Sequence, residues 1–178
     1  MIPSLLHFQY YSDVHFFLTP KNWHSLQANS DIFFNYIVGL SIMNQITEPV
    51  ARLLRGKNFA YLSTLMIDGW PQVTPTWIDL DEDGNNILIN TAEGRTKQKN
   101  VSRDPRVAIS ISDQVNPYDM VTIRGTVTEQ IKEGADEHID RLAKKYFGLD
   151  KYPYRSPAET RVILKIKPEK VFHQQPPQ

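Results

Sequence analysis

The sequence ILINTAEGRTKQKN, residues 87–100, carries most of the information in this chain. Its first five residues favour a strand, and the basic residues that follow predict a short helix over 93–102. Asn90, Thr91 and Gly94 lie at the junction. A strand that runs into a helix start presents unpaired backbone N–H groups and the positive end of the helix dipole. This junction is therefore the chain's strongest candidate for binding chemistry.

An anion at this junction, most simply a phosphate, would meet several kinds of donor. The backbone amides and the Thr91 hydroxyl could hydrogen bond to it, and the forked guanidinium of Arg95 could bind two oxygens at once. Lys97 and Lys99 follow in the same predicted helix. The basic residues could instead form a solvated face, because positions 95, 99 and 103 share one stripe of a helix. Spacing alone leaves both interpretations open.

The segments on either side predict a mainly β, antiparallel barrel. Asp68-Gly69 is typical of a hairpin turn, and Gly125 predicts a bulge within a long strand. The strands are joined mostly by short turns without regular βαβ alternation, which favours a barrel. The predicted strands cover residues 59–67, 71–80, 87–91, 106–112, 120–131 and 161–167, with an extension over 170–173, and further helices cover 47–56 and 134–147.

Composition excludes several classes of function. Twenty basic and twenty acidic residues give zero formal charge, which argues against a general nucleic-acid binder. The chain has no cysteine, so disulfides, thiol catalysis and cysteine metal sites are excluded, and this fits a cytoplasmic protein. No apolar run approaches the length of a membrane span. No triad or carboxylate pair stands out, so no catalytic residue is assigned, and a bound cofactor is expected to supply the reactivity.

One stretch imitates a calcium site. Asp79, Asp81, Asp83 and Gly84 resemble the start of a calcium-binding loop, but its twelfth position is Asn90 instead of a bidentate Glu. A charged hairpin turn is the preferred interpretation, and no metal site is expected.

The first 42 residues differ from the rest. They hold nine of the nineteen aromatic residues but only three charged ones, so we treat 1–42 as an atypical aromatic tail and 43–178 as the folded domain. The tail is expected to be a loosely packed segment, a partner-binding flap, or an extension upstream of a natural translation start at Met43. The last is favoured, because a regular domain begins just after Met43.

Two further segments carry candidate site residues. Gln72, Thr74 and Thr76 share one face of their strand and could contact the edge of a heterocycle, although solvent-facing threonines are the commoner arrangement. Tyr152 and Tyr154 lie in a proline-rich loop, which could cover a neighbouring site or be a plain surface connection.

The order of the elements and these motifs resemble a known family. From about residue 46 to 173 the chain is similar to the flavin and deazaflavin oxidoreductases related to pyridoxamine 5'-phosphate oxidase (the PPOX class), and within them to the small branch of coenzyme F-420-dependent enzymes. The matching segments are YLSTL at 61–65, PQVTPTW at 71–77, NTAEGRTKQKN at 90–100, RDPR at 103–106 and YPYR at 152–155.

The resemblance implies a split β-barrel like that of FMN-binding proteins, assembled as a homodimer with two cofactor sites at the interface. The site residues that it implies are the phosphate ligands Arg95 and Lys97, the pocket residues Asn90, Thr91, Lys99 and Asn100, the ring neighbours Gln72, Val73, Thr74 and Pro75, and Tyr154 of a loop that reaches the partner's site.

The resemblance also implies an activity. Reduced deazaflavin, coenzyme F-420, would transfer a hydride to an unsaturated small-molecule substrate. An FMN-dependent oxidase or reductase would use the same phosphate site. A non-catalytic flavin- or haem-binding protein, and a β-barrel interaction module with a solvated basic helix, stay open as alternatives.

Overall fold

The computed structural model describes residues 40–43 and 45–175, with side chains described from residue 45. The helices in this part of the chain are α3 (Glu48–Arg55), α4 (Thr96–Arg103) and α5 (Ala135–Phe147). Its strands are β1 (Leu40–Met43), β2 (Ala60–Leu65), β3 (Pro71–Thr76), β4 (Asp79–Leu80), β5 (Ile87–Ala92), β6 (Arg106–Ser112), β7 (Met120–Ile131) and β8 (Arg161–Gln174).

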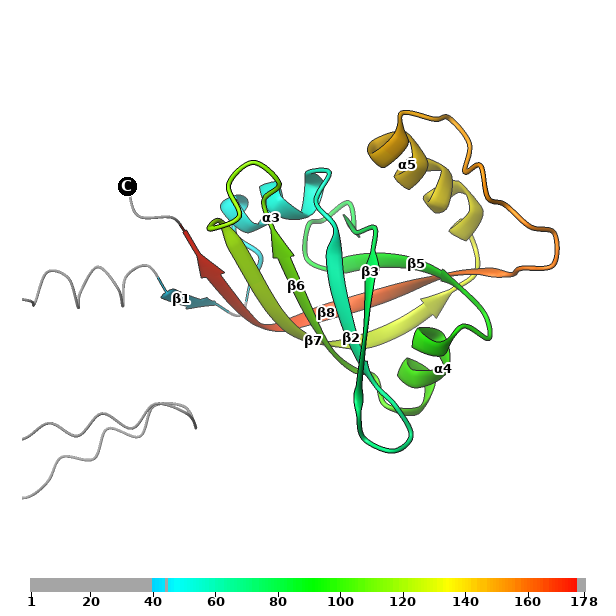
Figure 1. Ribbon diagram of the computed structural model, residues 1–178, viewed down its shortest axis with the longest axis horizontal. Coiled ribbons are helices and arrows are strands. Elements are labelled where there is room, and N and C mark those ends of the chain that lie inside the picture. The colour runs from blue at the N-terminus through cyan, green and yellow to red at the C-terminus, as the bar shows by residue number, and fades with distance from the viewer. Residues whose placement is uncertain (1–39, 44, 176–178) are drawn as a thin grey trace, which may run out of the picture. The chain divides into compact units, whose positions relative to one another are not determined.

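These eight strands form one antiparallel sheet. Their order is β3-β2-β6-β7-β8-β5-β4, and β1 pairs with the end of β8. Figure 1 shows the sheet strongly twisted, with α3 beside β6 and β7, and with α4 near the hairpin end of β2 and β3. This is the mainly β, antiparallel split barrel that the sequence predicts, and β3 and β4 are its edge strands.

The core lies on the concave side of the sheet. Strand β6 alternates between exposed and buried side chains along its length, as expected for a strand with one buried face. The α3 helix adds Val50, Leu53 and Leu54, which are at most 1% exposed. Burying each such aliphatic side chain stabilises the fold by about 1.5–3 kcal/mol.

The pairing of the long strand β7 with β8 is irregular at the predicted position. Arg124 pairs with Lys170 and Gly125 with Pro168, so the extra residue of this bulge is Glu169 of β8 and not Gly125 itself. A Cβ at Gly125 would lie 2.6 Å from the carbonyl oxygen of Lys167. Only glycine therefore allows the two backbones to approach this closely. The bulge also explains why β8 continues through Pro168 instead of ending before it.

The segment predicted as one strand over 71–80 is two strands. Strand β3 pairs with β2 at one edge of the sheet, whereas β4 pairs with β5 at the other. Between them, the Ile78 N–H donates to the Tyr146 hydroxyl at 3.2 Å, and the Ile78 carbonyl accepts from Lys145 at 2.8 Å. Because side chains of α5 bond to the N–H and carbonyl groups of Ile78, these groups do not continue the pairing of β3 with β2. The chain then passes from β3 at one edge of the sheet to β4 at the other.

The basic helix begins three residues later than predicted. Gly94 adopts the left-handed conformation, with φ of 76°, so Glu93 and Gly94 form a turn and Arg95 is the N-cap residue of α4. The helix ends at Arg103, one residue later than predicted, with Asp104 as its C-cap. Arg95 therefore lies at the N-terminus of α4 and not on the side of the helix.

The acidic stretch after β4 is a hairpin turn. The Asp81 carboxylate accepts N–H groups from Asn85 and Asn86, at 2.9 and 3.0 Å. Within the described residues, no group of three or more His, Cys, Asp or Glu side chains is arranged to hold a metal ion.

Most of the predicted aromatic tail lies outside the described residues, except for β1, whose backbone pairs with Val171–Gln174 of β8. In the ranges that the structure covers, no helix has both the length and the apolar character that crossing a membrane demands.

Candidate functional site

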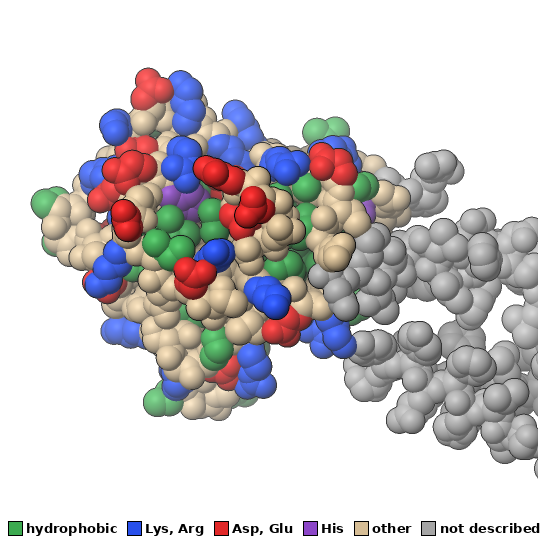
Figure 2. All heavy atoms as spheres, turned by 180° about the vertical axis from the view of Figure 1, so that it is seen from behind, with side chains coloured by type: hydrophobic (Ala, Val, Ile, Leu, Met, Phe, Trp, Pro, Cys, Tyr) green, Lys and Arg blue, Asp and Glu red, His purple; other side chains and the backbone are tan. Residues whose placement is uncertain are grey.

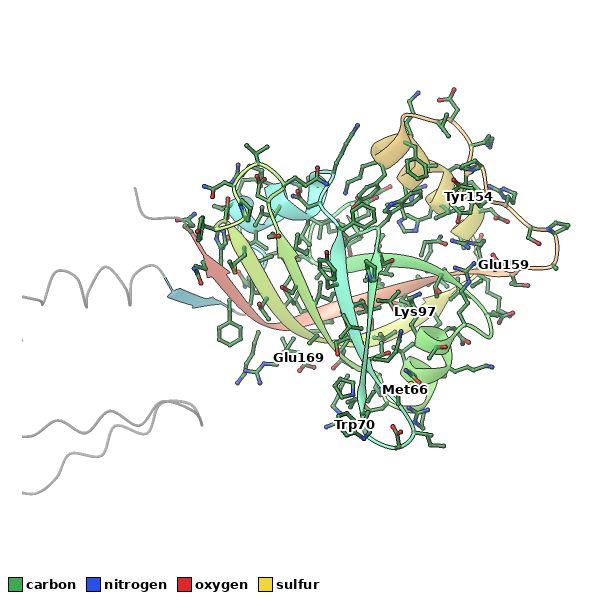
Figure 3. The ribbon with its side chains drawn as sticks, in the orientation of Figure 1. Met66, Trp70, Lys97, Tyr154, Glu159 and Glu169 are labelled. Atoms are coloured by element: carbon green, nitrogen blue, oxygen red, sulfur yellow. The ribbon has the colours of Figure 1, made fainter. Side chains whose placement is uncertain are left out.

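Four charged side chains meet where β5 ends and α4 begins. Arg95 forms an ion pair with Glu159 of the α5–β8 loop, with Nη2 2.5 Å from Oε1. Arg161, the first residue of β8, approaches the other carboxylate oxygen of Glu159 at 3.3 Å. Lys97, on the first turn of α4, is half-buried beside them. Figure 3 shows Lys97 and Glu159 on neighbouring elements of this region.

The cluster carries more positive than negative charge. Burial lowers the pKa of Lys97, and the neighbouring charges of Arg95 and Arg161 lower it further. Across the described residues Lys97 has no ion-pair partner, and Glu159 is the carboxylate that pairs with both arginines. Three cations around one carboxylate leave a local excess of positive charge, which a bound anion would neutralise.

Arg161 is a site residue that the sequence analysis missed. Its side chain is 6% exposed, and its guanidinium lies over the Tyr152 ring, 5.2 Å from the centroid. Its Nε donates to the Asn90 Oδ1 at 2.9 Å. Arg161 pairs with Ala92, directly before the turn of Glu93 and Gly94, so the strand pairing in the structure brings it to this place.

Asn90 holds the Arg161 side chain in place through its amide oxygen. Its amide nitrogen donates to the Ala135 carbonyl at 2.7 Å and approaches His138 Nδ1 at 3.3 Å, both on α5. All the hydrogen-bonding groups of the Asn90 side chain are therefore used inside the protein. The structure makes Asn90 a support for Arg161.

Thr91 leaves a buried hydroxyl without a partner in the described part of the chain. The residue is 1% exposed, and its Oγ1 has no hydrogen-bond partner. A buried hydroxyl without a partner costs free energy. Thr91 shares the face of β5 that carries the core residues Ile87 and Ile89, opposite the face on which Asn90 contacts Arg161.

A second polar group links α4 to the β2–β3 hairpin. The Asn100 amide donates to the Thr64 hydroxyl at 3.0 Å, and Thr64 approaches Gln72 Oε1 at 3.3 Å. Gln72 in turn donates to Thr74 at 2.6 Å. The structure thus joins the predicted residues Gln72, Thr74 and Asn100 in one network. This network orients the Gln72 amide.

The other predicted ring neighbours point the opposite way. Val73 and Pro75 are exposed on the outer face of β3, whereas Gln72 and Thr74 are half-buried. Tyr61 of β2, which pairs with Pro75, is exposed on the same outer face. Edge strand β3 therefore offers a polar face and an apolar face.

Two of the predicted site residues, Lys99 and Tyr154, are exposed at the surface of the protein. Lys99 is exposed on α4. Tyr154 is 70% exposed and packs edge-on against Tyr152. Figure 3 shows Tyr154 beside α5, apart from Lys97. The loop that carries Tyr154 is fixed to its own helix, because the Asp140 carboxylate accepts from Arg155 at 2.8 Å and from the Tyr152 N–H at 2.9 Å.

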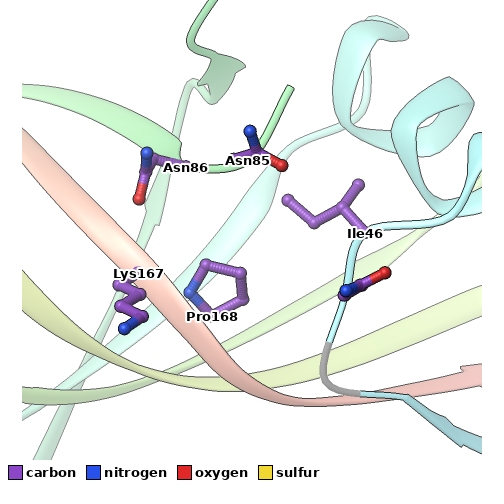
Figure 4. A pocket seen from close by; sticks show the side chains of 6 residues that line it. Ile46, Asn85, Asn86, Lys167 and Pro168 are labelled. Atoms are coloured by element: carbon purple, nitrogen blue, oxygen red, sulfur yellow. The ribbon is translucent and has the colours of Figure 1, made fainter. Parts of the chain in front are cut away.

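A hollow elsewhere on the molecule contains none of the predicted site residues. It has a volume of about 310 Å³. Figure 4 shows it beside β8, with Lys167 and Pro168 of that strand in its lining. Its polar side chains are Gln45, Asn85, Asn86 and Lys167, and its apolar ones are Ile46 and Pro168. The charged cluster is the better candidate for a ligand site than this hollow, because the cluster combines buried hydrogen-bond donors with an excess of positive charge.

A buried polar group lies behind the site, between β4 and α5. His138 is fully buried, with its Nε2 3.9 Å from Asp79, and burial lowers its pKa to about 4. Lys145 lies 4.0 Å from the same carboxylate. His138 is therefore neutral near pH 7 and serves as an acceptor for the Asn90 amide.

Comparison with known proteins agrees with this architecture. The pattern of the pyridoxamine 5'-phosphate oxidase family matches residues 46–175. Among solved structures, the chain is similar to an F420 reductase at 29% identity and a TM-score of 0.59, covering 67% of this chain and 92% of that one.

More distant structures share the fold alone. Conserved hypothetical protein Rv2991 from Mycobacterium tuberculosis is 20% identical, with a TM-score of 0.56 and coverage of 74% of this chain and 87% of that one. General Stress Protein 26 from Bacillus anthracis is 17% identical, with a TM-score of 0.53 and coverage of 73% and 94%.

Proposed function

Because the chain belongs to the pyridoxamine 5'-phosphate oxidase family, whose fold is that of flavin-related oxidoreductases, we propose that it is an oxidoreductase that uses coenzyme F-420. In this proposal, reduced deazaflavin transfers a hydride to an unsaturated small-molecule substrate. The single observation that carries the proposal is the cluster of Arg95, Lys97 and Arg161 around one carboxylate, which matches the phosphate group of such a cofactor.

The residues of this chain would bind and orient the cofactor. Arg95 presents a fork that fits two phosphate oxygens, and Lys97 adds a point charge. The first amides of α4 would donate to the same group. Gln72, whose amide is held by Thr64 and Thr74, is suited to the edge of a heterocyclic ring.

When bound, the cofactor would supply the hydride chemistry that none of the chain's side chains provides. The protein would contribute position and electrostatic environment, which lowers the barrier by holding the reactants together. We assign no side chain as proton donor. His138, fully buried behind the site, is a support and not a donor.

Two cofactors, each with a tricyclic ring and a phosphate group, compete in this proposal. F-420 is favoured by the likeness to an F420 reductase over 92% of that chain. FMN is the second candidate, because the family is described as pyridoxamine 5'-phosphate oxidase. Equilibrium titration of the chain with each cofactor, followed by turnover of the reduced form with a panel of unsaturated acceptors, separates them. Absence of binding by both cofactors would refute the proposal, and binding without turnover would leave a flavin-binding protein.

We further propose a homodimer with the cofactor sites at its interface. The outer face of β2 and β3 is an edge surface with exposed apolar residues, among them Tyr61 at 51% and Val73 at 56%. Exposed apolar patches on an edge strand favour association. Sedimentation at micromolar concentration is expected to give twice the chain mass. A mass of one chain would contradict the dimer.

A further inference from the structure

Glu159 occupies the donors that a phosphate would need. One of its carboxylate oxygens pairs with Arg95 at 2.5 Å, and the other approaches Arg161 at 3.3 Å. The Arg95 interaction is the main reason that the pKa of Glu159 is lowered. A carboxylate that bridges two arginines presents the same charge-assisted hydrogen bonds as an anionic ligand.

We propose that Arg161 is a third cationic residue of the phosphate site, and that Glu159 fills this site until the phosphate of the cofactor displaces it. The inference rests on the proposed function, because it concerns the same site. It adds one ligand residue, Arg161, and one internal competitor, Glu159.

The two residues differ in how firmly they are held. Arg161 is 6% exposed and is fixed by Asn90 and the Tyr152 ring. The side chain of Glu159 is 31% exposed, and it contacts the two arginines. The backbone beside it is anchored, because the Thr160 carbonyl accepts from the Glu93 N–H at 2.9 Å. Rotation of the Glu159 side chain alone would therefore free the arginines without moving the loop.

The charges favour the exchange. Glu159 supplies one negative charge to three cationic side chains, so the cluster stays positive when the carboxylate is in place. The phosphate monoester of FMN carries close to two negative charges at neutral pH and offers more acceptor oxygens than a carboxylate. The phosphodiester of coenzyme F-420 carries one negative charge, so the gain in charge is larger for FMN. Either group can engage Lys97 in addition to the two arginines. The ligand therefore gains an interaction that Glu159 does not make.

The test removes the competitor and measures the phosphate contribution alone. Affinity is measured for FMN and riboflavin, and for coenzyme F-420 and its phosphate-free deazaflavin, with wild type and Glu159→Gln. We expect Glu159→Gln to bind the phosphate-bearing ligands about three- to fivefold more tightly, since a half-exposed ion pair is worth up to about 1 kcal/mol. Affinity for the phosphate-free ligands should not change.

Glu93→Gln is the matched control. Glu93 lies in the turn between β5 and α4 and pairs with Lys132, at 2.7 Å, so its substitution removes the same charge without freeing the arginines. An equal gain in both variants, or no gain in Glu159→Gln, would overturn the proposal. Stabilisation by inorganic phosphate, read as the shift in melting temperature, gives a second measurement. It should be larger in Glu159→Gln than in wild type, and an equal shift would also contradict the proposal.

Arg161→Gln tests the third cation. It should weaken binding of the phosphate-bearing ligands more than tenfold and leave the phosphate-free ligands within about twofold, because a buried charged partner is lost. Arg141→Gln, at an exposed arginine of α5, should change neither. An equal loss for ligands with and without phosphate would give Arg161 a purely structural role. If wild type prefers the phosphate-bearing ligands while Glu159→Gln and Arg161→Gln behave as wild type, this inference fails and the proposed function stands.

Discussion

A single buried amide connects α5 to the charged cluster. Asn90 accepts from Arg161 on one side and donates to Ala135 and His138 on the other. Because the amide nitrogen donates to the imidazole, His138 must keep its Nδ1 free of a proton. The neutral state of the buried His138 thus supports the position of Asn90, and through Asn90 that of Arg161.

His138 makes stability depend on pH. Its pKa falls from 6.5 to about 4 on folding because the ring is buried. The unfolded chain therefore binds a proton between these values and the folded chain does not, so stability is full above pH 6.5 and is lost as the pH falls toward 4. At about 1.4 kcal/mol per pKa unit, the loss amounts to about 3 kcal/mol.

Urea unfolding at pH 7 and pH 4.5 measures this loss. His138→Gln should lower the stability at pH 7, because the buried ring packs against α5, yet the variant should lose less between the two pH values than wild type does. Equal losses in wild type and variant would show that other groups cause the acid sensitivity.

Residue types at the site were predictable only in part. Arg95, Lys97 and Thr91 stand in one stretch of sequence, so their proximity follows from local structure. Arg161 lies 66 positions after Arg95 in the chain and reaches the site only through the pairing of β5 with β8. Asn90 was predicted to line the pocket, and no pattern in the sequence shows that α5 would occupy its amide.

Among the elements, the β7–β8 pair depends most on one residue. Gly125 faces the Lys167 carbonyl oxygen so closely that an added Cβ would lie 2.6 Å from it. We expect Gly125→Ala to destabilise the fold by about 1–3 kcal/mol, the usual range for overpacking in a tight region. The urea midpoint measures this change.

Thr126→Ala is the control for the bulge. Thr126 is the next residue, and it donates a 2.6 Å hydrogen bond to the exposed Glu169, so its loss should cost little. Equal destabilisation by the two substitutions would mean that the close approach at Gly125 does not limit the strand pairing.

Where apolar and polar residues alternate regularly, the ends of a strand could be predicted to the exact residue. The predicted bounds 106–112 and 120–131 are those of β6 and β7, because both strands alternate between a buried and an exposed face. The segment 71–80 was not predictable as two strands, since Trp77 and Ile78 both favour strands. Its break arises from Tyr146 and Lys145 of α5, which are distant in sequence and bind the backbone of Ile78.

At the scale of the whole molecule, charge is balanced overall and unbalanced at one place. The chain has twenty basic and twenty acidic residues, and Figure 2 shows the two kinds interleaved over one face. An even distribution of this kind does not attract polyanions over long distances. The excess at Arg95, Lys97 and Arg161 is local, which suits a small anionic group held by short contacts.

The most direct test of the central claim, that this cluster binds the phosphate of a cofactor, is fluorescence titration of the deazaflavin with FMN in parallel. Arg95→Ala and Lys97→Ala should each weaken binding more than tenfold, or by about 1.4 kcal/mol or more, while the fold survives. Lys99→Ala, at an exposed position of the same helix, should have the smaller effect. Unchanged affinity in both the Arg95 and the Lys97 variants would show that the basic helix is only a solvated face.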